Sequence, residues 1–106
     1  MLDLFKSIFG APGVELNAED LRNGTIVDVR TAGEYQNGHV AGSLNIPLQL
    51  LDRKLLKLRQ LDAPIIACCA SGSRSGMAAR QLNELGIETI NGGSWHNVDR
   101  QVKQLV

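Results

Sequence analysis

The central part of the chain reads Ile65-Ile-Ala-Cys-Cys-Ala-Ser-Gly-Ser-Arg-Ser75. It begins with a short apolar run that is typical of a buried strand, and Arg74 begins a stretch with helical spacing. Between the two lie small residues, 70–73, which let successive backbone N–H groups turn toward a common centre. The helix that follows adds the positive end of its dipole at the same place. The segment therefore predicts an anion-binding turn between a strand and a helix.

Cys69 stands at the base of this turn. Inward-pointing amides and a helix dipole stabilise a thiolate, so they lower the pKa of a thiol placed there. Because the thiolate is the nucleophilic form of cysteine, Cys69 is the candidate catalytic residue. The alternative for either cysteine is a buried side chain that acts as a small hydrophobic residue. We favour that alternative for Cys68, which still belongs to the apolar strand.

On both sides of the turn, short β-prone runs alternate with helical runs. This pattern predicts an α/β fold with a mostly parallel sheet. The expected strands are a weak one at 14–16 and others at 25–29, 43–46, 65–68 and 87–90. The expected helices are 17–23, 31–36, 48–61, 74–85 and 94–105. Residues 91–93, Asn-Gly-Gly, are expected to form a turn before the last helix.

Length and composition limit the class of protein. A chain of 106 residues has room for one domain. With 43% hydrophobic residues it can bury a core without disulfide bonds. Eleven basic and eleven acidic residues cancel, so there is no excess positive charge for a phosphate backbone. We therefore expect no nucleic-acid partner.

The chain begins MLDLFKSIFG, which places Leu2, Phe5 and Phe9 on one helical stripe before a Pro-Gly break. We expect residues 1–13 to be an amphipathic extension that packs on the domain or binds a partner, and residues 14–106 to be the domain. Charged residues interrupt this segment, so it does not read as a signal peptide, and no stretch approaches the roughly 20 apolar residues of a membrane span. The expected location is the cytoplasm.

Further motifs lie on both sides of the central turn. Residues 28–47 read DVRTAGEYQNGHVAGSLNIP, and Gly92-Gly93 and Trp95 follow near the end of the chain. Together with Cys69-Ala-Ser-Gly-Ser-Arg-Ser75, these motifs resemble the signature of the rhodanese-like domain family in order and spacing. The resemblance implies a three-layer α/β/α domain with a mostly parallel central sheet of about five strands. It places Cys69 at the carboxyl end of a central strand, where open α/β sheets bind ligands.

The resemblance also implies a reaction. In sulfurtransferases of this family, a cysteine thiolate takes the outer sulfur of thiosulfate or of a persulfide donor and carries it as a persulfide to a thiophilic acceptor. Cys69 is then the sulfur carrier, and the implied substrate-binding residues are Ala70, Ser71, Gly72, Ser73, Arg74 and Ser75. The implied partners are a small sulfur donor and a thiol or protein acceptor. No cofactor or metal is expected, and the oligomeric state stays open.

Loop length separates this reaction from a related one. Four residues lie between Cys69 and Arg74, which suits the family's sulfur-transfer loop, whereas five lie between Cys68 and Arg74. Five is the spacing of cysteine phosphatases, in which an arginine grips a phosphate. Ala67 stands where those enzymes usually have a histidine, which favours sulfur transfer. The alternatives are therefore a phosphatase-like enzyme that uses Cys68 and a non-catalytic rhodanese-like interaction module.

Other polar residues have supporting rather than catalytic assignments. Asp28 and Arg30 follow the clearest strand, where they brace the loop or bind substrate, and we favour bracing. Arg74 is the only cation of the loop and is expected to steer an anion, while the loop serines donate to that anion or cap the helix. His39 is expected to be structural, and Trp95 to belong to the core.

Overall fold

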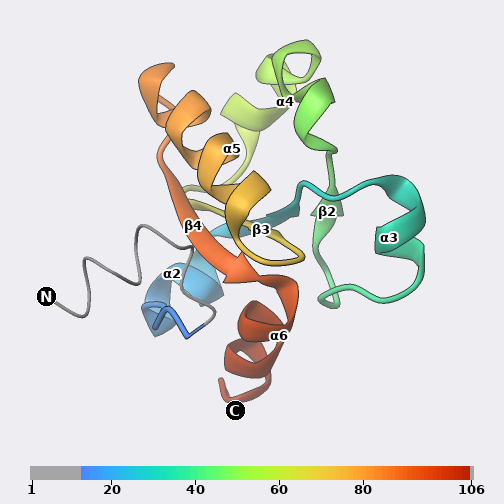
Figure 1. Ribbon diagram of the computed structural model, residues 1–106. Helices are drawn as coiled ribbons and strands as arrows, with labels where there is room; N and C mark the ends of the chain where they lie inside the picture. The colour runs from blue at the N-terminus through green and yellow to red at the C-terminus, as the bar shows by residue number, and fades with distance from the viewer. Residues whose placement is uncertain (1–12, 106) are drawn as a thin grey trace, which may run out of the picture.

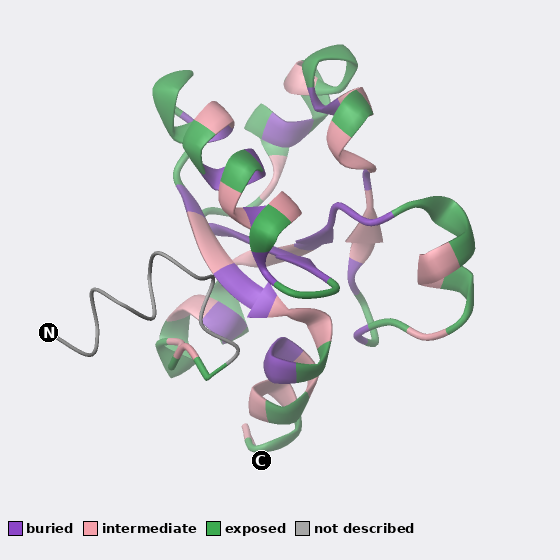
Figure 2. Ribbon diagram, viewed as in Figure 1, coloured by how far each residue is buried: buried purple, intermediate pink, exposed green. Residues whose placement is uncertain are grey.

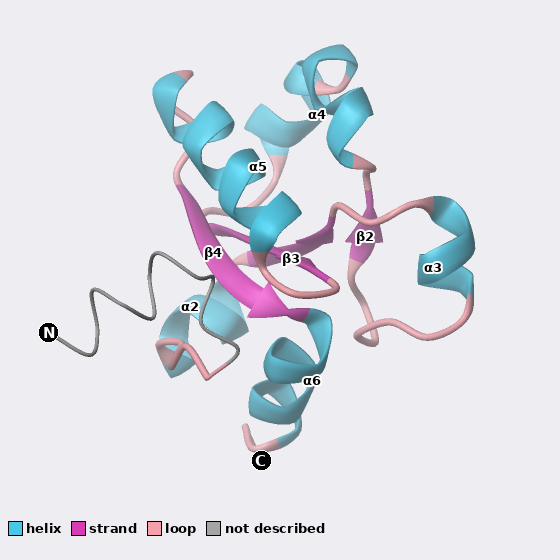
Figure 3. Ribbon diagram, in the orientation of Figure 1, coloured by secondary structure: helices cyan, strands magenta, loops and turns pink. Residues whose placement is uncertain are grey.

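The computed structural model describes residues 13–105, and the predicted amphipathic stripe of the N-terminus lies outside them. Figure 3 shows strands at the centre with helices around them. The strands are β1 Thr25–Asp28, β2 Leu44–Asn45, β3 Ile65–Cys69 and β4 Thr89–Ser94. The helices are α2 Ala18–Asn23, α3 Ala32–Gln36, the 3₁₀ helix η1 Leu48–Arg53, α4 Leu55–Gln60, α5 Ser73–Glu84 and α6 Trp95–Lys103.

The sheet is parallel, as the alternating pattern predicts. Its strand order is β2-β1-β3-β4, and every neighbouring pair is parallel. Because β3 lies between β1 and β4, the predicted anion-binding turn follows a central strand (Figure 1). The described residues contain four strands, so the expected count of about five is wrong by one.

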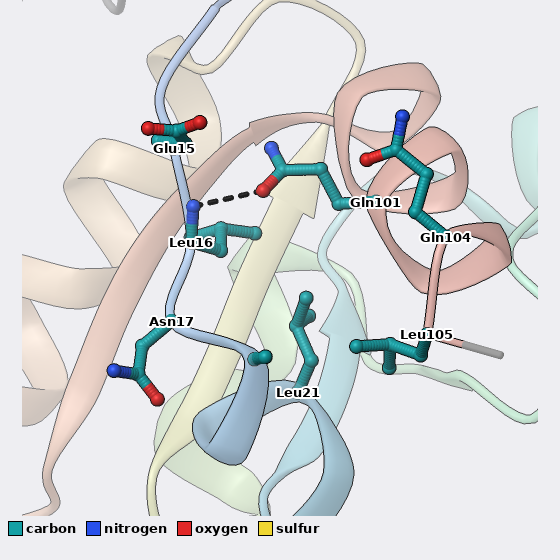
Figure 4. A pocket seen from close by; sticks show the side chains of 8 residues that line it. Glu15, Leu16, Asn17, Leu21, Gln101, Gln104 and Leu105 are labelled. Atoms are coloured by element: carbon teal, nitrogen blue, oxygen red, sulfur yellow. Dashed lines mark hydrogen bonds between the residues drawn. The ribbon is translucent and has the colours of Figure 1, made fainter.

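The missing strand is the weak one predicted at 14–16. These residues run beside α6, whose side chains form hydrogen bonds with their backbone N–H and carbonyl groups (Figure 4). The Leu16 N–H donates to Gln101 Oε1 at 2.9 Å, and the Val14 carbonyl accepts from Gln101 Nε2 and Asn97 Nδ2, both at 2.8 Å. Amide side chains thus satisfy hydrogen bonds that a neighbouring strand would otherwise satisfy.

Two apolar clusters pack on opposite faces of the sheet, which confirms the predicted three layers. One cluster joins the sheet to η1, α4 and α5 through residues such as Leu51, Leu58 and Leu82. The other joins it to α2 and α6 through Leu21 and Val98. Figure 2 shows burial concentrated on the strands and on the helix sides that face them.

Local capping signals place several helix starts where the sequence predicts them. Asn17 Oδ1 accepts from the N–H groups of Glu19 and Asp20 at the start of α2. Thr31 and Glu34 form a reciprocal capping box at the start of α3. Within residues 13–105, none of the helices has the length and apolar character that a membrane crossing requires.

The single helix predicted at 48–61 is instead two helices that meet at Lys54. The 3₁₀ geometry of η1 places Leu48 and Leu51 on one side, because residues three apart coincide in that helix. In α4, Leu55 and Leu58 share a face at the same spacing. The bend, with φ −117° and ψ 20° at Lys54, lets both pairs reach the same apolar cluster.

The last strand also differs from the prediction. β4 begins at Thr89, two residues later than expected, and it includes the Asn-Gly-Gly segment that the sequence suggests as a turn. Between Ala67 and Cys69 the register against β3 shifts, because Asn91 pairs with Ala67 and Ser94 with Cys69. The extra residue forms a bulge, and Gly93 supplies the left-handed backbone there with φ +83°.

Candidate active site

The predicted catalytic turn lies at the carboxyl end of β3. The strand ends at Cys69 and α5 begins at Ser73, so the connecting loop is only three residues long. Figure 1 shows this loop near the arrowhead of β4 and the start of α6. Gly72 caps α5 with φ +97°, a left-handed conformation that glycine adopts without steric cost. Such a short, tightly turned loop keeps its amide groups close to the cysteine.

The sulfur of Cys69 lies at the centre of this turn. Its Sγ accepts hydrogen bonds from the N–H of Gly72 at 3.0 Å and from the N–H of Ser75 at 3.3 Å. The Ser75 hydroxyl lies 3.3 Å from the same sulfur. The structure thus places Cys69, Gly72 and Ser75 together. A sulfur that accepts several hydrogen bonds at a helix N-terminus is suited to carrying negative charge.

The environment of Cys69 changes the acidity of its thiol. Burial makes the largest contribution and would raise the pKa, but hydrogen bonds oppose it. The Ser75 hydroxyl lowers the pKa most, followed by the backbone amides of Ser75, Gly72 and Ser71. Together they outweigh burial, so the pKa of the Cys69 thiol lies below its usual range.

Cys68 has the opposite environment. Its side chain lies in the apolar cluster beneath α6, whereas Cys69 belongs to the cluster beneath α5. Cys68 is 0% exposed, and burial followed by repulsion from Asp28 holds the pKa of its thiol far above the usual range. It has the burial expected of a small hydrophobic residue. The geometry offers no support for Cys68 as a nucleophile.

Arg74 is near the site but is already paired. Its Nη1 and Nη2 donate to the two carboxylate oxygens of Glu34 at 2.7 and 3.0 Å. The hydrogen bond from Arg74, followed by that from the Thr31 backbone, lowers the pKa of Glu34 to about 2. The expected anion-steering arginine is therefore half of an ion pair between α5 and α3. Sequence reasoning did not single out Glu34 as its partner.

The remaining loop residues predicted to bind substrate lie on the rim of the turn. Ala70, Ser71 and Ser73 are exposed, in contrast to the buried Gly72 and Ser75. The Ser71 and Ser73 residues are therefore exposed, while the amides and the hydroxyl that contact the Cys69 sulfur belong to buried residues, and Cys69 itself is 1% exposed. No serine caps α5, because Gly72 holds the cap position without a side-chain hydrogen bond.

Asn91 supports the floor of the site from β4 and was not predicted from the sequence. Its Oδ1 accepts from the Gly93 N–H at 3.0 Å and lies 2.7 Å from the Ser75 hydroxyl, whose one proton is donated either to Asn91 or to the Cys69 sulfur. Its Nδ2 donates to the Gly72 carbonyl at 3.2 Å. One side chain thus connects the β4 bulge with the loop and α5. The only sequence signal was the Asn-Gly-Gly segment, which was interpreted as a turn.

Replacing Ser75 with alanine is expected to shift the alkylation profile of Cys69 to higher pH. The variant loses the hydroxyl that contributes most to lowering the pKa of the thiol, while burial still favours the neutral form. The rate of reaction with iodoacetamide, measured against pH, gives the thiol pKa in each protein. An unchanged profile in a folded variant would show that the amides alone set the acidity of Cys69.

Asp28, the last residue of β1, and Arg30 form a buried ion pair, with side chains 0% and 6% exposed. Arg30 Nη2 donates to Asp28 Oδ2 at 2.7 Å and to the Gly38 carbonyl at 2.7 Å, and Nη1 donates to the Glu34 carbonyl at 3.3 Å. The Arg30 guanidinium also lies 4.9 Å from the centre of the Trp95 ring. The pair therefore ties the segment that contains α3 to the sheet and to α6.

The other residues considered as site candidates lie apart from the sulfur contacts. The His39 ring stacks on Tyr35 with 3.7 Å between ring centroids, and its Nδ1 lies 2.7 Å from the Tyr35 carbonyl. Trp95 packs against the cluster beneath α6, and His96 is exposed. A surface pocket between residues 15–21 and the end of α6 is lined by none of the predicted site residues (Figure 4).

Comparisons with known proteins identify the family of this chain. A model of the family described as "Rhodanese-like domain" matches residues 14–97. The chain is 36% identical over 69 residues to the uncharacterized protein YqhL of Bacillus subtilis, covering 65% of this chain and 54% of that protein. It is 30% identical over 79 residues to the thiosulfate sulfurtransferase GlpE of Shewanella oneidensis, covering 70% and 77%.

A solved structure extends the likeness to three dimensions. The human single-domain sulfurtransferase TSTD1 superposes with a TM-score of 0.61 at 25% identity, covering 83% of this chain and 95% of that one. The chain spans about half the length of YqhL, so the likeness to that protein concerns only part of it. This chain belongs to the rhodanese-like domain family, because the family model matches residues 14–97 and the parallel sheet has helices on both faces.

Proposed function

We propose that the protein is a sulfurtransferase in which Cys69 carries a sulfane sulfur as a persulfide. The observation that carries this proposal is the position of the Cys69 sulfur, which accepts hydrogen bonds from the Gly72 and Ser75 amides and has a lowered pKa. A larger fraction of this thiol is thereby ionised than of an ordinary cysteine thiol, and it lies at the carboxyl end of a central strand.

In the first half-reaction, the Cys69 thiolate attacks the outer sulfur of the donor. A new S–S bond forms as the donor's own S–S bond breaks, and the electron pair leaves with sulfite when the donor is thiosulfate or with a thiolate when it is a persulfide. The outer sulfur then carries negative charge. The first N–H of α5 that bonds within the helix is that of Gly76, which donates to the Gly72 carbonyl. The N–H groups of Ser73 and Arg74 come before it, so we propose that they stabilise that charge.

In the second half-reaction, a thiophilic acceptor attacks the outer sulfur of the persulfide. The bond between the two sulfurs breaks, and Cys69 leaves as a thiolate that the same amides stabilise. The acceptor is a thiol, a protein cysteine or, in an assay, cyanide. Because the donor product leaves before the acceptor reacts, the kinetics are expected to be ping-pong.

The relatives support sulfur transfer as the class of reaction. GlpE is named a thiosulfate sulfurtransferase and TSTD1 a single-domain sulfurtransferase, and the chain covers most of both. The phosphatase alternative requires Cys68, whose sulfur is buried in the other layer and whose pKa is raised.

The proposal is tested by loading the protein with sulfur. After incubation with thiosulfate or with a small persulfide, the intact mass of the desalted protein is expected to increase by one sulfur atom. Added cyanide is expected to remove that atom and release an equal amount of thiocyanate. Protein alkylated beforehand at Cys69 is the control and gains nothing. A free thiol that gains no sulfur from either donor would favour the non-catalytic module instead.

A further inference from the structure

The carboxylate of Glu34 contacts both Thr31 and Arg74. Glu34 Oε1 accepts from the Thr31 N–H at 3.0 Å and from the Thr31 hydroxyl at 3.1 Å. The same carboxylate accepts hydrogen bonds from both terminal nitrogens of Arg74. The side chain of Glu34 is 37% exposed and that of Arg74 is 32% exposed. A capping box thus fixes the carboxylate on one side and a two-point ion pair fixes it on the other.

A second arginine in the same region is also neutralised. Arg30 pairs with Asp28 and donates its remaining hydrogen bonds to the carbonyls of Glu34 and Gly38. The catalytic loop itself contains no cation other than Arg74. Both arginines are therefore charge-balanced by carboxylates, and a donor approaching Cys69 meets amide dipoles rather than a free positive charge. This arrangement gives little attraction to a dianion.

We infer that Glu34 is a specificity-determining residue that disfavours thiosulfate and favours small persulfide donors of lower charge. This inference rests on the proposed sulfur transfer. Both donors deliver the outer sulfur by the same exchange of S–S bonds, but thiosulfate enters with two negative charges and leaves as the sulfite dianion. A persulfide brings at most one negative charge at its reacting end and leaves as a thiolate. Pairing Arg74 with Glu34 removes the cation that thiosulfate would need.

The variant Glu34→Gln tests this inference directly. Glutamine keeps an acceptor oxygen for the Thr31 capping box but loses the charge that holds Arg74. We expect the KM for thiosulfate to fall about tenfold, because an unpaired guanidinium then faces the dianion. The KM for the persulfide of N-acetylcysteine methyl ester, which has no other ionisable group, is expected to change by less than about twofold.

A matched control removes one negative charge elsewhere. Glu88 is exposed and its carbonyl accepts from the Ile65 N–H, which places it at the opposite end of β3 from Cys69. Glu88→Gln is expected to leave both KM values unchanged, because charges separated by more than a Debye length are screened. This comparison separates the effect of freeing Arg74 from an effect of net charge.

A measurement on the unaltered protein gives an independent test. If Glu34 neutralises Arg74 and Asp28 neutralises Arg30, kcat/KM for thiosulfate is expected to change little as sodium chloride is added. A free cation at the site would make kcat/KM fall steeply. Such a steep fall would overturn the inference. So would a thiosulfate KM in folded Glu34→Gln that is unchanged, higher, or lowered equally for both donors. If the unaltered protein transfers sulfur from neither donor, the proposed function itself fails, and the inference fails with it.

Discussion

Cys69→Ser is expected to lose sulfur transfer by about 10³-fold or more, because removal of a covalent nucleophile leaves only binding and amide stabilisation. A serine hydroxyl at this position stays protonated at neutral pH and forms no persulfide. The assays are steady-state release of thiocyanate and the intact-mass measurement of bound sulfur. Both are expected to fall to background, since the Gly72 and Ser75 amides then have no thiolate to stabilise.

Cys68→Ala is the matched control for this prediction. Cys68 lies in an apolar environment beneath α6, so alanine leaves no buried polar group there. We expect this variant to lose about 1 kcal/mol of unfolding free energy while it still takes up one sulfur atom. If folded Cys68→Ala loses sulfur uptake while Cys69→Ser retains it, the assignment of the carrier is wrong.

Arg30→Met is expected to lower the free energy of unfolding by about 3–5 kcal/mol, because it leaves a buried carboxylate without its partner. Asp28 is 0% exposed, and Arg30 provides three of its hydrogen bonds through guanidinium nitrogens. The same substitution removes the donors to the Glu34 and Gly38 carbonyls, so the segment around α3 loses its attachment. Urea denaturation followed by circular dichroism measures the loss.

Arg74→Met provides the comparison for Arg30→Met. It also removes an arginine that donates two hydrogen bonds to a carboxylate, here that of Glu34, but the side chains of this pair are about one-third exposed. Water can solvate Glu34 after the substitution, so the loss of stability is expected to be much smaller. Equal losses for the two variants would mean that burial does not decide the stability contribution of the Asp28–Arg30 pair.

The sequence was sufficient where the signal is local. The apolar run 65–68, followed by Cys69 and small residues, predicts β3, the loop and the start of α5 to within one residue, because each follows from neighbouring residues. The caps at Asn17 and Thr31 are equally local. The assignment of Cys69 to the turn and of Cys68 to the strand interior rests on the same short segment.

Contacts between distant residues could not be predicted in this way. Glu34 and Arg74 are 40 residues apart, and no pattern in either segment indicates that the two side chains meet. Asn91 contacts Ser75 and the Gly72 carbonyl from β4, which lies 16 and 19 residues further along the chain. The first expected strand fails for the same reason, since Gln101 lies 85 residues from its partner Leu16.

The two adjacent cysteines of β3 limit how the spacing between the proposed nucleophile and Arg74 can change. Alternate residues of a strand face opposite layers, and here Cys69 faces α5 while Cys68 faces α6. Moving the nucleophile back by one position would carry the thiol to the wrong side of the sheet instead of widening the ring of amides. A longer loop therefore requires an inserted residue after Cys69, so point substitutions alone cannot convert this site into one with the wider spacing.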